Sequence, residues 1–145
     1  MQKKTTLLEF LNYENKYIYS KIDNAMTRQL SNVDCCTALH TNKNISNNIK
    51  ESAINNLYSI DGVGILSRIN ESVSMIMKDL NFEYGGVVKK ENSFDELTKY
   101  PFCESVEKEI ITKEIDEILD RLTILDKIVY DEAVKIFNKK LEIYE

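Results

Sequence analysis

The sequence has little of what a β architecture needs. Only one proline and four glycines occur among its 145 residues. A fold of many short strands needs frequent tight turns, and glycine and proline are the residues that such turns use most. Their scarcity favours helices. The length permits one hydrophobic core and excludes a second domain.

The sequence also lacks a basic block and a long apolar run. Its 24 acidic residues outnumber its 19 lysines and arginines, the formal charge is −5, and the lysines are scattered among glutamates. A nucleic-acid partner is therefore disfavoured, because phosphates are neutralised by a positive patch. No apolar run approaches the roughly 18 residues of a membrane span. The apolar run before Glu9 is too short for a signal peptide, so we predict a cytoplasmic protein.

Cysteine is scarce as well, and its pattern argues against a metal. The three cysteines, Cys35, Cys36 and Cys103, form no Cys-x-x-Cys pair, and an odd number favours reduced thiols. Cys36 and His40 are four residues apart and could share a helix face. A zinc site needs about four ligands, however, and only the distant Cys103 could complete one. We predict no metal site and small, half-buried thiols in a loop.

The stretch from Asp61 to Leu80 contains two of the four glycines and changes its period. Its first part, around Val63 and Ile65, is a short apolar run that predicts a strand. Its second part predicts an amphipathic helix, because five apolar residues recur at helical spacing: Ile69, Val73, Ile76, Met77 and Leu80. The pair Gly62-x-Gly64 is not a nucleotide-binding loop, since it lacks the third glycine of the dinucleotide fingerprint and the lysine of a triphosphate loop.

Local signals predict helices in most of the remaining chain. Thr6 and Glu9 form a capping box that begins a helix. Asp23 or Asn24 caps a second helix that ends near Leu30. Residues 31–48 predict a mobile loop, with helical order returning around Ser46. A second capping box, Ser93 to Glu96, predicts a further short helix.

Two long helices end the chain, each with one apolar stripe. The first stripe is Ile111, Ile115, Ile118, Leu119 and Leu122, and the second is Tyr130, Val134, Phe137, Leu141 and Tyr144. Asp126 is a good cap between them, which predicts an antiparallel hairpin. The sequence therefore predicts a mainly α fold with one or two short strands and a terminal helical hairpin.

In their order along the chain, several short motifs resemble the carboxy-terminal part of sulfotransferases that use 3′-phosphoadenosine 5′-phosphosulfate, especially the carbohydrate-type and bacterial family. The matching segments are Leu8–Leu11, Asn24–Leu30, Ala53–Leu57, Val63–Ile65, Glu71–Val73, Asn92–Ser93 and Asp126–Tyr130. The resemblance implies that residues 1–145 are a single partial domain from an α/β, P-loop-like fold. The family's phosphosulfate loop and its 3′-phosphate segment belong to an amino-terminal half that these residues do not contain.

The resemblance also implies a function and a set of site residues. Arg28 would orient the phosphosulfate donor or an acidic acceptor, and Asn92 and Ser93 would reach a donor phosphate. Ser93 equally fits a helix cap. The expected reaction moves a sulfuryl group to a hydroxyl of an acceptor such as a carbohydrate. The chain would be a truncated or split-gene product, inactive alone, that binds the donor only when an N-terminal half-protein completes it.

A second hypothesis comes from a different class of protein. The competing hypothesis is a free-standing helical protein-interaction module without enzymatic activity, whose hairpin of two long helices docks a partner; a homo-oligomer is a further possible assembly. Cooperative unfolding of the isolated chain would distinguish it from a torn α/β fold, which exposes apolar surface.

Overall fold

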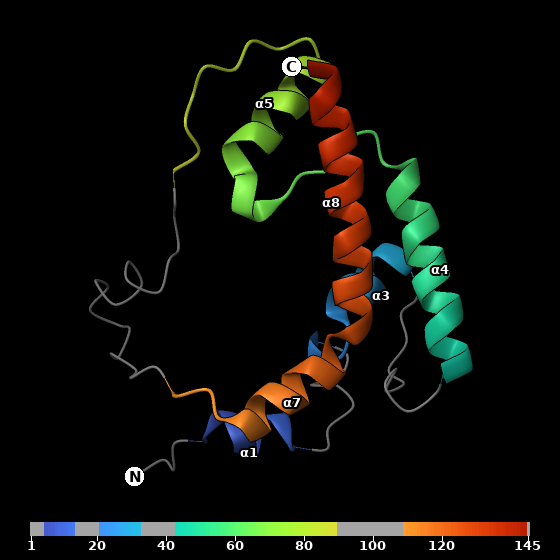
Figure 1. Cartoon of the computed structure of the whole chain (residues 1–145), viewed down its shortest axis with the longest axis vertical. Helices are drawn as coiled ribbons and strands as arrows, with labels where there is room; N and C mark the ends of the chain where they lie inside the picture. Colours follow the sequence, from blue (N-terminus) through green and yellow to red (C-terminus); the bar gives the residue numbers. More distant parts are fainter. Residues whose placement is uncertain (1–4, 14–20, 33–42, 90–108, 145) are drawn as a thin grey trace.

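The computed structural model describes residues 5–13, 21–32, 43–89 and 109–144, without the side chains of 43–45 (Figure 1). This part of the chain is mainly helical, as predicted, and contains no strand. Its helices are α1 (Leu7–Leu11), α3 (Ala25–Ser31), α4 (Lys43–Ser59), the 3₁₀-helix η2 (Leu66–Arg68), α5 (Ile69–Asp79), α7 (Lys113–Leu122) and α8 (Ile124–Tyr144). None of the helices described has both the length and the apolar character of a membrane span.

The long helix α8 is the centre of the fold. Helix α4 packs along one side of α8, α5 lies on the other, and α3 packs against both α4 and α8 (Figure 1). The main core contains buried side chains from α4, the 63–65 segment, α5 and α8: Ala53, Leu57, Val63, Ile65, Met75, Val129, Ala133 and Phe137. Of the predicted α8 stripe only Phe137 is buried, because neighbours on several sides bury other positions of this helix.

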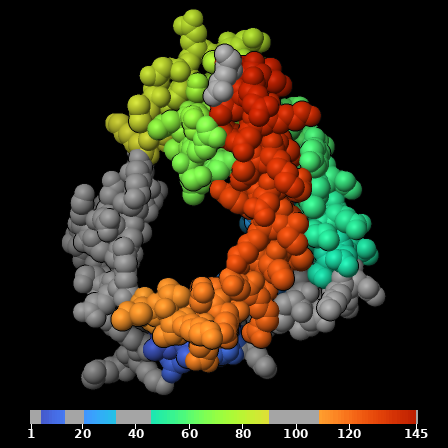
Figure 2. Space-filling view, in the orientation of Figure 1, coloured from blue at the N-terminus to red at the C-terminus, as the bar shows by residue number. Residues whose placement is uncertain are grey.

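Helices α1 and α7 form a second, smaller cluster. Leu11 packs with Ile115 and Leu122, and this cluster lies at the opposite end of α8 from α5 (Figure 2). The predicted capping box of Thr6 and Glu9 is present. In addition, both carboxylate oxygens of Glu109 accept from the Leu7 N–H at 2.9 Å, so a residue just before α7 satisfies the start of α1.

The predicted hairpin of the last two helices is wrong. Only Thr123 separates α7 from α8, and the two helices meet at a bend instead of folding back along each other (Figure 1). The Thr123 hydroxyl donates to the Leu119 carbonyl at 2.8 Å, a bond within the helix that commonly bends it. One residue is too short to reverse the chain.

Helices α3 and α8 exchange their caps. Asn24 occupies the N-cap position of α3, but its Oδ1 accepts from the backbone N–H groups of Leu125 and Asp126 at the start of α8, at 2.7 and 3.2 Å. In return, the Asp126 carboxylate accepts from the N–H groups of Met26 and Thr27, at 3.2 and 2.7 Å. The prediction that Asp126 caps the last helix is wrong, because α8 already begins at Ile124 and the Asp126 carboxylate caps the start of α3 instead. The exchange fixes the position of α3 on α8.

The predicted strand at Val63 to Ile65 does not form. These residues have no strand partner among those described, and Ile65 instead donates its N–H to the Ser72 Oγ of α5 at 2.8 Å. The segment runs against α5, and both glycines lie at close approaches. A Cβ on Gly62 would lie 3.1 Å from Ile76 Cγ1, and one on Gly64 would lie 3.0 Å from Ser72 Cβ. The glycines are therefore explained by packing.

Gly64→Ala is expected to lower the free energy of unfolding by about 1–2 kcal/mol, because the added methyl group overlaps the Ser72 side chain. Gly85→Ala is the matched control, since nothing lies within 4 Å of its Cβ position, and its effect should stay within about 0.5 kcal/mol. Urea unfolding of both variants measures the difference. Equal effects would contradict the close approach.

Part of the segment predicted as a loop, residues 31–48, is helical in the structure. Ser31 ends α3, and α4 already begins at Lys43; residues 33–42 lie outside the described part. Polar side chains of α4 satisfy the end of α3, because Asn56 Nδ2 donates to the Leu30 carbonyl at 2.7 Å. The helix predicted at Ser93 to Glu96 also lies outside the described residues.

Candidate functional site

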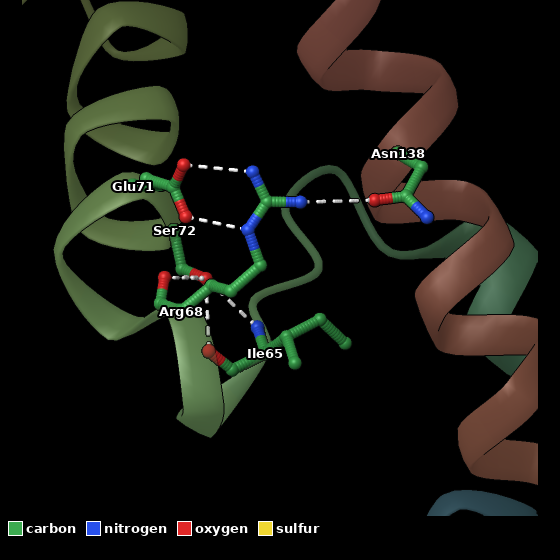
Figure 3. Close-up of polar contacts among 5 residues, drawn as sticks. All are labelled: Ile65, Arg68, Glu71, Ser72 and Asn138. Atoms are coloured by element: carbon green, nitrogen blue, oxygen red, sulfur yellow. Dashed lines mark hydrogen bonds and ion pairs between the residues drawn. The ribbon is translucent and has the colours of Figure 1, made fainter.

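Arg68 fastens the beginning of α5 to α8. Its guanidinium donates two hydrogen bonds to the Glu71 carboxylate, at 2.5 and 2.7 Å, and a third to Asn138 Oδ1 at 3.2 Å (Figure 3). The same guanidinium lies 4.9 Å from the centroid of the Phe137 ring. The hydrogen bonds from Arg68 to the Glu71 carboxylate hold the pKa of Glu71 below its ordinary value. The charge of Glu71 is thus matched within the protein.

Ser72 fixes the turn that leads into α5. Its Oγ lies 2.9 Å from the Arg68 carbonyl and 3.2 Å from that of Ile65, which the hydroxyl can reach as a donor (Figure 3). The same oxygen accepts the Ile65 N–H described above, so one buried hydroxyl connects the extended segment, η2 and α5. Ser72 therefore has a structural role at this turn.

A second polar contact fastens the far end of α5. The Asp79 carboxylate accepts a hydrogen bond from the Tyr144 hydroxyl and pairs with the Lys140 ammonium, both from the end of α8. Lys140 also donates to the Asp61 carbonyl at 2.7 Å. The contacts from Lys140 and Tyr144 lower the pKa of Asp79, and the contact with Asp79 raises the pKa of Tyr144.

Asp79→Asn is expected to lower stability at neutral pH and to lose this effect in acid. Because the pKa of Asp79 is depressed in the folded state, its charge stabilises the fold above the unfolded value of 3.8. That stabilisation disappears as the pH falls through the lower folded value. The urea midpoints of the wild type and the variant should therefore begin to converge as the pH falls below 3.8 and coincide only below the depressed pKa of the folded state. Asp131→Asn, at an exposed carboxylate of α8, is the control and should show a smaller difference.

Between these two contacts lies a groove of about 340 Å³. Its lining residues are Asn70, Glu71, Ser74, Met75 and Lys78 from α5, with Leu141 and Tyr144 from α8. Its surface is mostly apolar, with polar groups from α5. A volume of this size lies at the lower end of the roughly 300–1,000 Å³ typical of ligand pockets. It is large enough for one or two large apolar side chains of a partner.

Polar groups of α5 recur along the groove at helical spacing. Asn70, Ser74 and Lys78 are four residues apart, so they lie on one face of α5. Asn70 Oδ1 accepts the Val88 N–H at 2.8 Å, while its Nδ2 can still donate. Lys78 lies 5.5 Å from the centroid of the Tyr144 ring, and no carboxylate of the described residues pairs with it.

The groove can bind, but its residues do not form a set for catalysis. Its lining contains no histidine or cysteine, and its single carboxylate, Glu71, is held by Arg68. A nucleophile needs an adjacent base to activate it, and Ser74 has none among these residues. The arrangement suits recognition of an apolar group by shape and of a charged group by Lys78.

Of the site residues implied by the sulfotransferase resemblance, only Arg28 lies in the part of the chain that the structure describes, and it does not line the groove. Arg28 is only 6% exposed. Its Nε donates to the Asp23 carbonyl at 2.6 Å, and its guanidinium pairs with the Asp23 carboxylate at 3.2 Å. Arg28 therefore connects α3 to the residue just before the helix. Asn92 and Ser93 lie outside the described residues. Their roles in donor binding stay predictions.

Metal ligands are likewise not gathered in the described part of the chain. No group of three or more histidine, cysteine, aspartate or glutamate side chains is placed there to hold a metal ion. The cysteines and His40 lie outside the described residues.

Sequence reasoning missed the groove. Only the spacing of Asn70, Ser74 and Lys78 could have indicated it, and the same spacing is typical of any solvated helix face. No family model, no curated protein and no solved structure matches this chain.

Proposed function

We propose that this chain is a helical protein-interaction module without enzymatic activity, and that the groove between α5 and α8 is its binding surface. One observation carries the proposal: a mostly apolar groove lies between two polar contacts that fix the helices on either side of it. A preformed groove reduces the ordering cost of binding.

Helical grooves are a common means of protein recognition. An apolar side chain of the partner enters the groove, and polar groups at its edge set the orientation. Met75 and Leu141 supply apolar surface here, and Asn70 and Ser74 supply hydrogen-bonding groups. The lack of a nucleophile and base among these residues favours binding over catalysis.

The sulfotransferase hypothesis gains no support from the described residues. The fragment would contribute a strand to a parallel sheet, and the segment expected to be that strand is packed against α5. Arg28, its expected donor ligand, is paired with Asp23. The donor carries several negative charges and needs backbone amides at a helix start together with cations. Transfer of a sulfuryl group to a carbohydrate hydroxyl therefore stays a prediction.

Unfolding of the isolated chain tests the proposal against this alternative. A self-contained module should unfold in urea in one transition, seen identically by far-ultraviolet circular dichroism and by the fluorescence of its eight tyrosines. Calorimetry with 3′-phosphoadenosine 5′-phosphosulfate should show no heat of binding. Separate transitions together with strong binding of a hydrophobic dye would contradict a self-contained module, and binding of the donor would favour the sulfotransferase hypothesis.

A further inference from the structure

We infer that the partner recognised by the α5–α8 groove is an acidic peptide segment with one large apolar side chain. This inference rests on the proposed function and adds the chemistry of the partner. The apolar side chain would occupy the space above Met75 and Leu141, and a neighbouring carboxylate would pair with Lys78.

The charge around the groove supports an acidic partner. Of the charged groups that line it, Glu71 is paired with Arg68, while Lys78 has no carboxylate partner among the described residues. At the far end of α5, Asp79 is paired with Lys140. Lys78 is therefore the charged group of the described lining that lacks a partner of opposite charge, in a chain whose formal charge is −5.

Other exposed charges nearby, including Asp61, whose carbonyl accepts from Lys140, lie outside the lining of the groove. Lys139 and Glu142 belong to the same part of α8, have opposite signs and do not line the groove. The segment that follows α5 carries Glu83 and Lys89, which are also of opposite sign, and its Val88 N–H is bound to Asn70. A basic segment would face Lys78 without compensation. The Lys78 ammonium thus favours an acidic partner over a basic one.

The size of the groove limits the apolar part of the partner. A volume of about 340 Å³ accepts one or two large side chains, but not a whole helix face. Lys78 lies over the ring of Tyr144, so its ammonium is held near the apolar surface of the groove. A carboxylate next to the apolar anchor could then meet Lys78 while the anchor is inserted. The recognised feature is therefore a leucine, phenylalanine or similar residue beside aspartate or glutamate.

Selection from a library of random seven-residue peptides displayed on phage tests the inference with the full chain. Wild-type protein is the target, and Ser74→Trp, which fills the groove from α5, is used for counter-selection after its fold is checked by circular dichroism and urea unfolding. We expect enrichment of peptides in which one large apolar residue is flanked by aspartate or glutamate. Enrichment of basic or uncharged peptides would overturn the inference and leave the proposed function intact. Equal recovery on wild type and Ser74→Trp would overturn both.

A selected acidic peptide, labelled with a fluorophore, then measures the contribution of Lys78. Lys78→Glu should weaken binding about five- to tenfold at low salt, and the difference should shrink in high salt. Lys113→Glu makes the same charge change at an exposed position of α7, outside the groove, and should change binding less than twofold. Equal effects of the two substitutions would overturn the specific pairing. Self-association of the protein that Ser74→Trp abolishes would assign the groove to a second copy and overturn the acidic-peptide inference.

Discussion

Phe137→Ala is expected to lower the free energy of unfolding by about 4 kcal/mol. Phe137 is 1% exposed and belongs to the main core together with residues of α4, α5 and the 63–65 segment. Its removal leaves a cavity that these neighbours share and takes away the ring below Arg68. Because typical domains are stable by only 5–15 kcal/mol, the change is a large part of the total. Urea unfolding followed by circular dichroism measures it.

Two further substitutions identify the cause of the loss. Phe137→Leu keeps most of the volume and should cost about 1–1.5 kcal/mol. Ile143→Ala removes a large side chain of the same helix that is 75% exposed, and its effect should stay within about 0.5 kcal/mol. A comparable loss for Phe137 and Ile143 would show that the core of the isolated chain is not packed as described.

Features of the fold that depend on nearby residues could be predicted from the sequence. The Thr6 capping box involves atoms three residues apart, and its hydrogen bonds are the ones expected. The helical period of residues 69–80 predicted α5 correctly, which spans Ile69–Asp79. In both cases the signal is contained within one or two helical turns, so the rest of the chain does not have to be known.

Features that depend on distant residues were predicted less well. The short apolar run around Val63 and Ile65 predicts a strand from its own composition. The Ile65 N–H, however, donates to the Ser72 side chain instead of to another strand. A serine in a helical sequence pattern does not indicate such a contact. None of the five apolar residues of the predicted stripe is among the buried residues of α5, which are Ser72 and Met75, because the extended segment and α8 approach the helix from different sides.

The groove could not be predicted for the same reason. It exists because Arg68 and Asp79 reach different points of α8 and leave a space between the helices. Each of these residues has an ordinary surface interpretation in the sequence, as an i, i+3 ion pair or a helix-end charge. Arg68 and Asp79 lie at the two ends of one groove only because α5 packs against α8 in the folded chain.

The exchanged caps give the second large expected effect. Asp126→Ala should lower the free energy of unfolding by about 2–4 kcal/mol, because it leaves the Thr27 N–H and hydroxyl without their acceptor in a buried position. Asn24→Gly should lower the free energy of unfolding by about 1–2 kcal/mol, because two N–H groups at the start of α8 lose their acceptor. Glycine suits this test because Asn24 has φ 52°, where alanine would be strained.

Combining the two substitutions tests whether the caps act as one unit. Each cap holds the starts of α3 and α8 in the position that the other cap requires. Removal of one cap should therefore already weaken the hydrogen bonds of the other. We expect the double variant to lose about 1 kcal/mol less than the sum of the single losses. Asn32→Gly is the matched control, because Asn32 also has positive φ but is exposed at the end of α3, and its effect should be small. Strict additivity would mean that α3 and α8 are held together by their apolar contacts, with the two caps contributing independently.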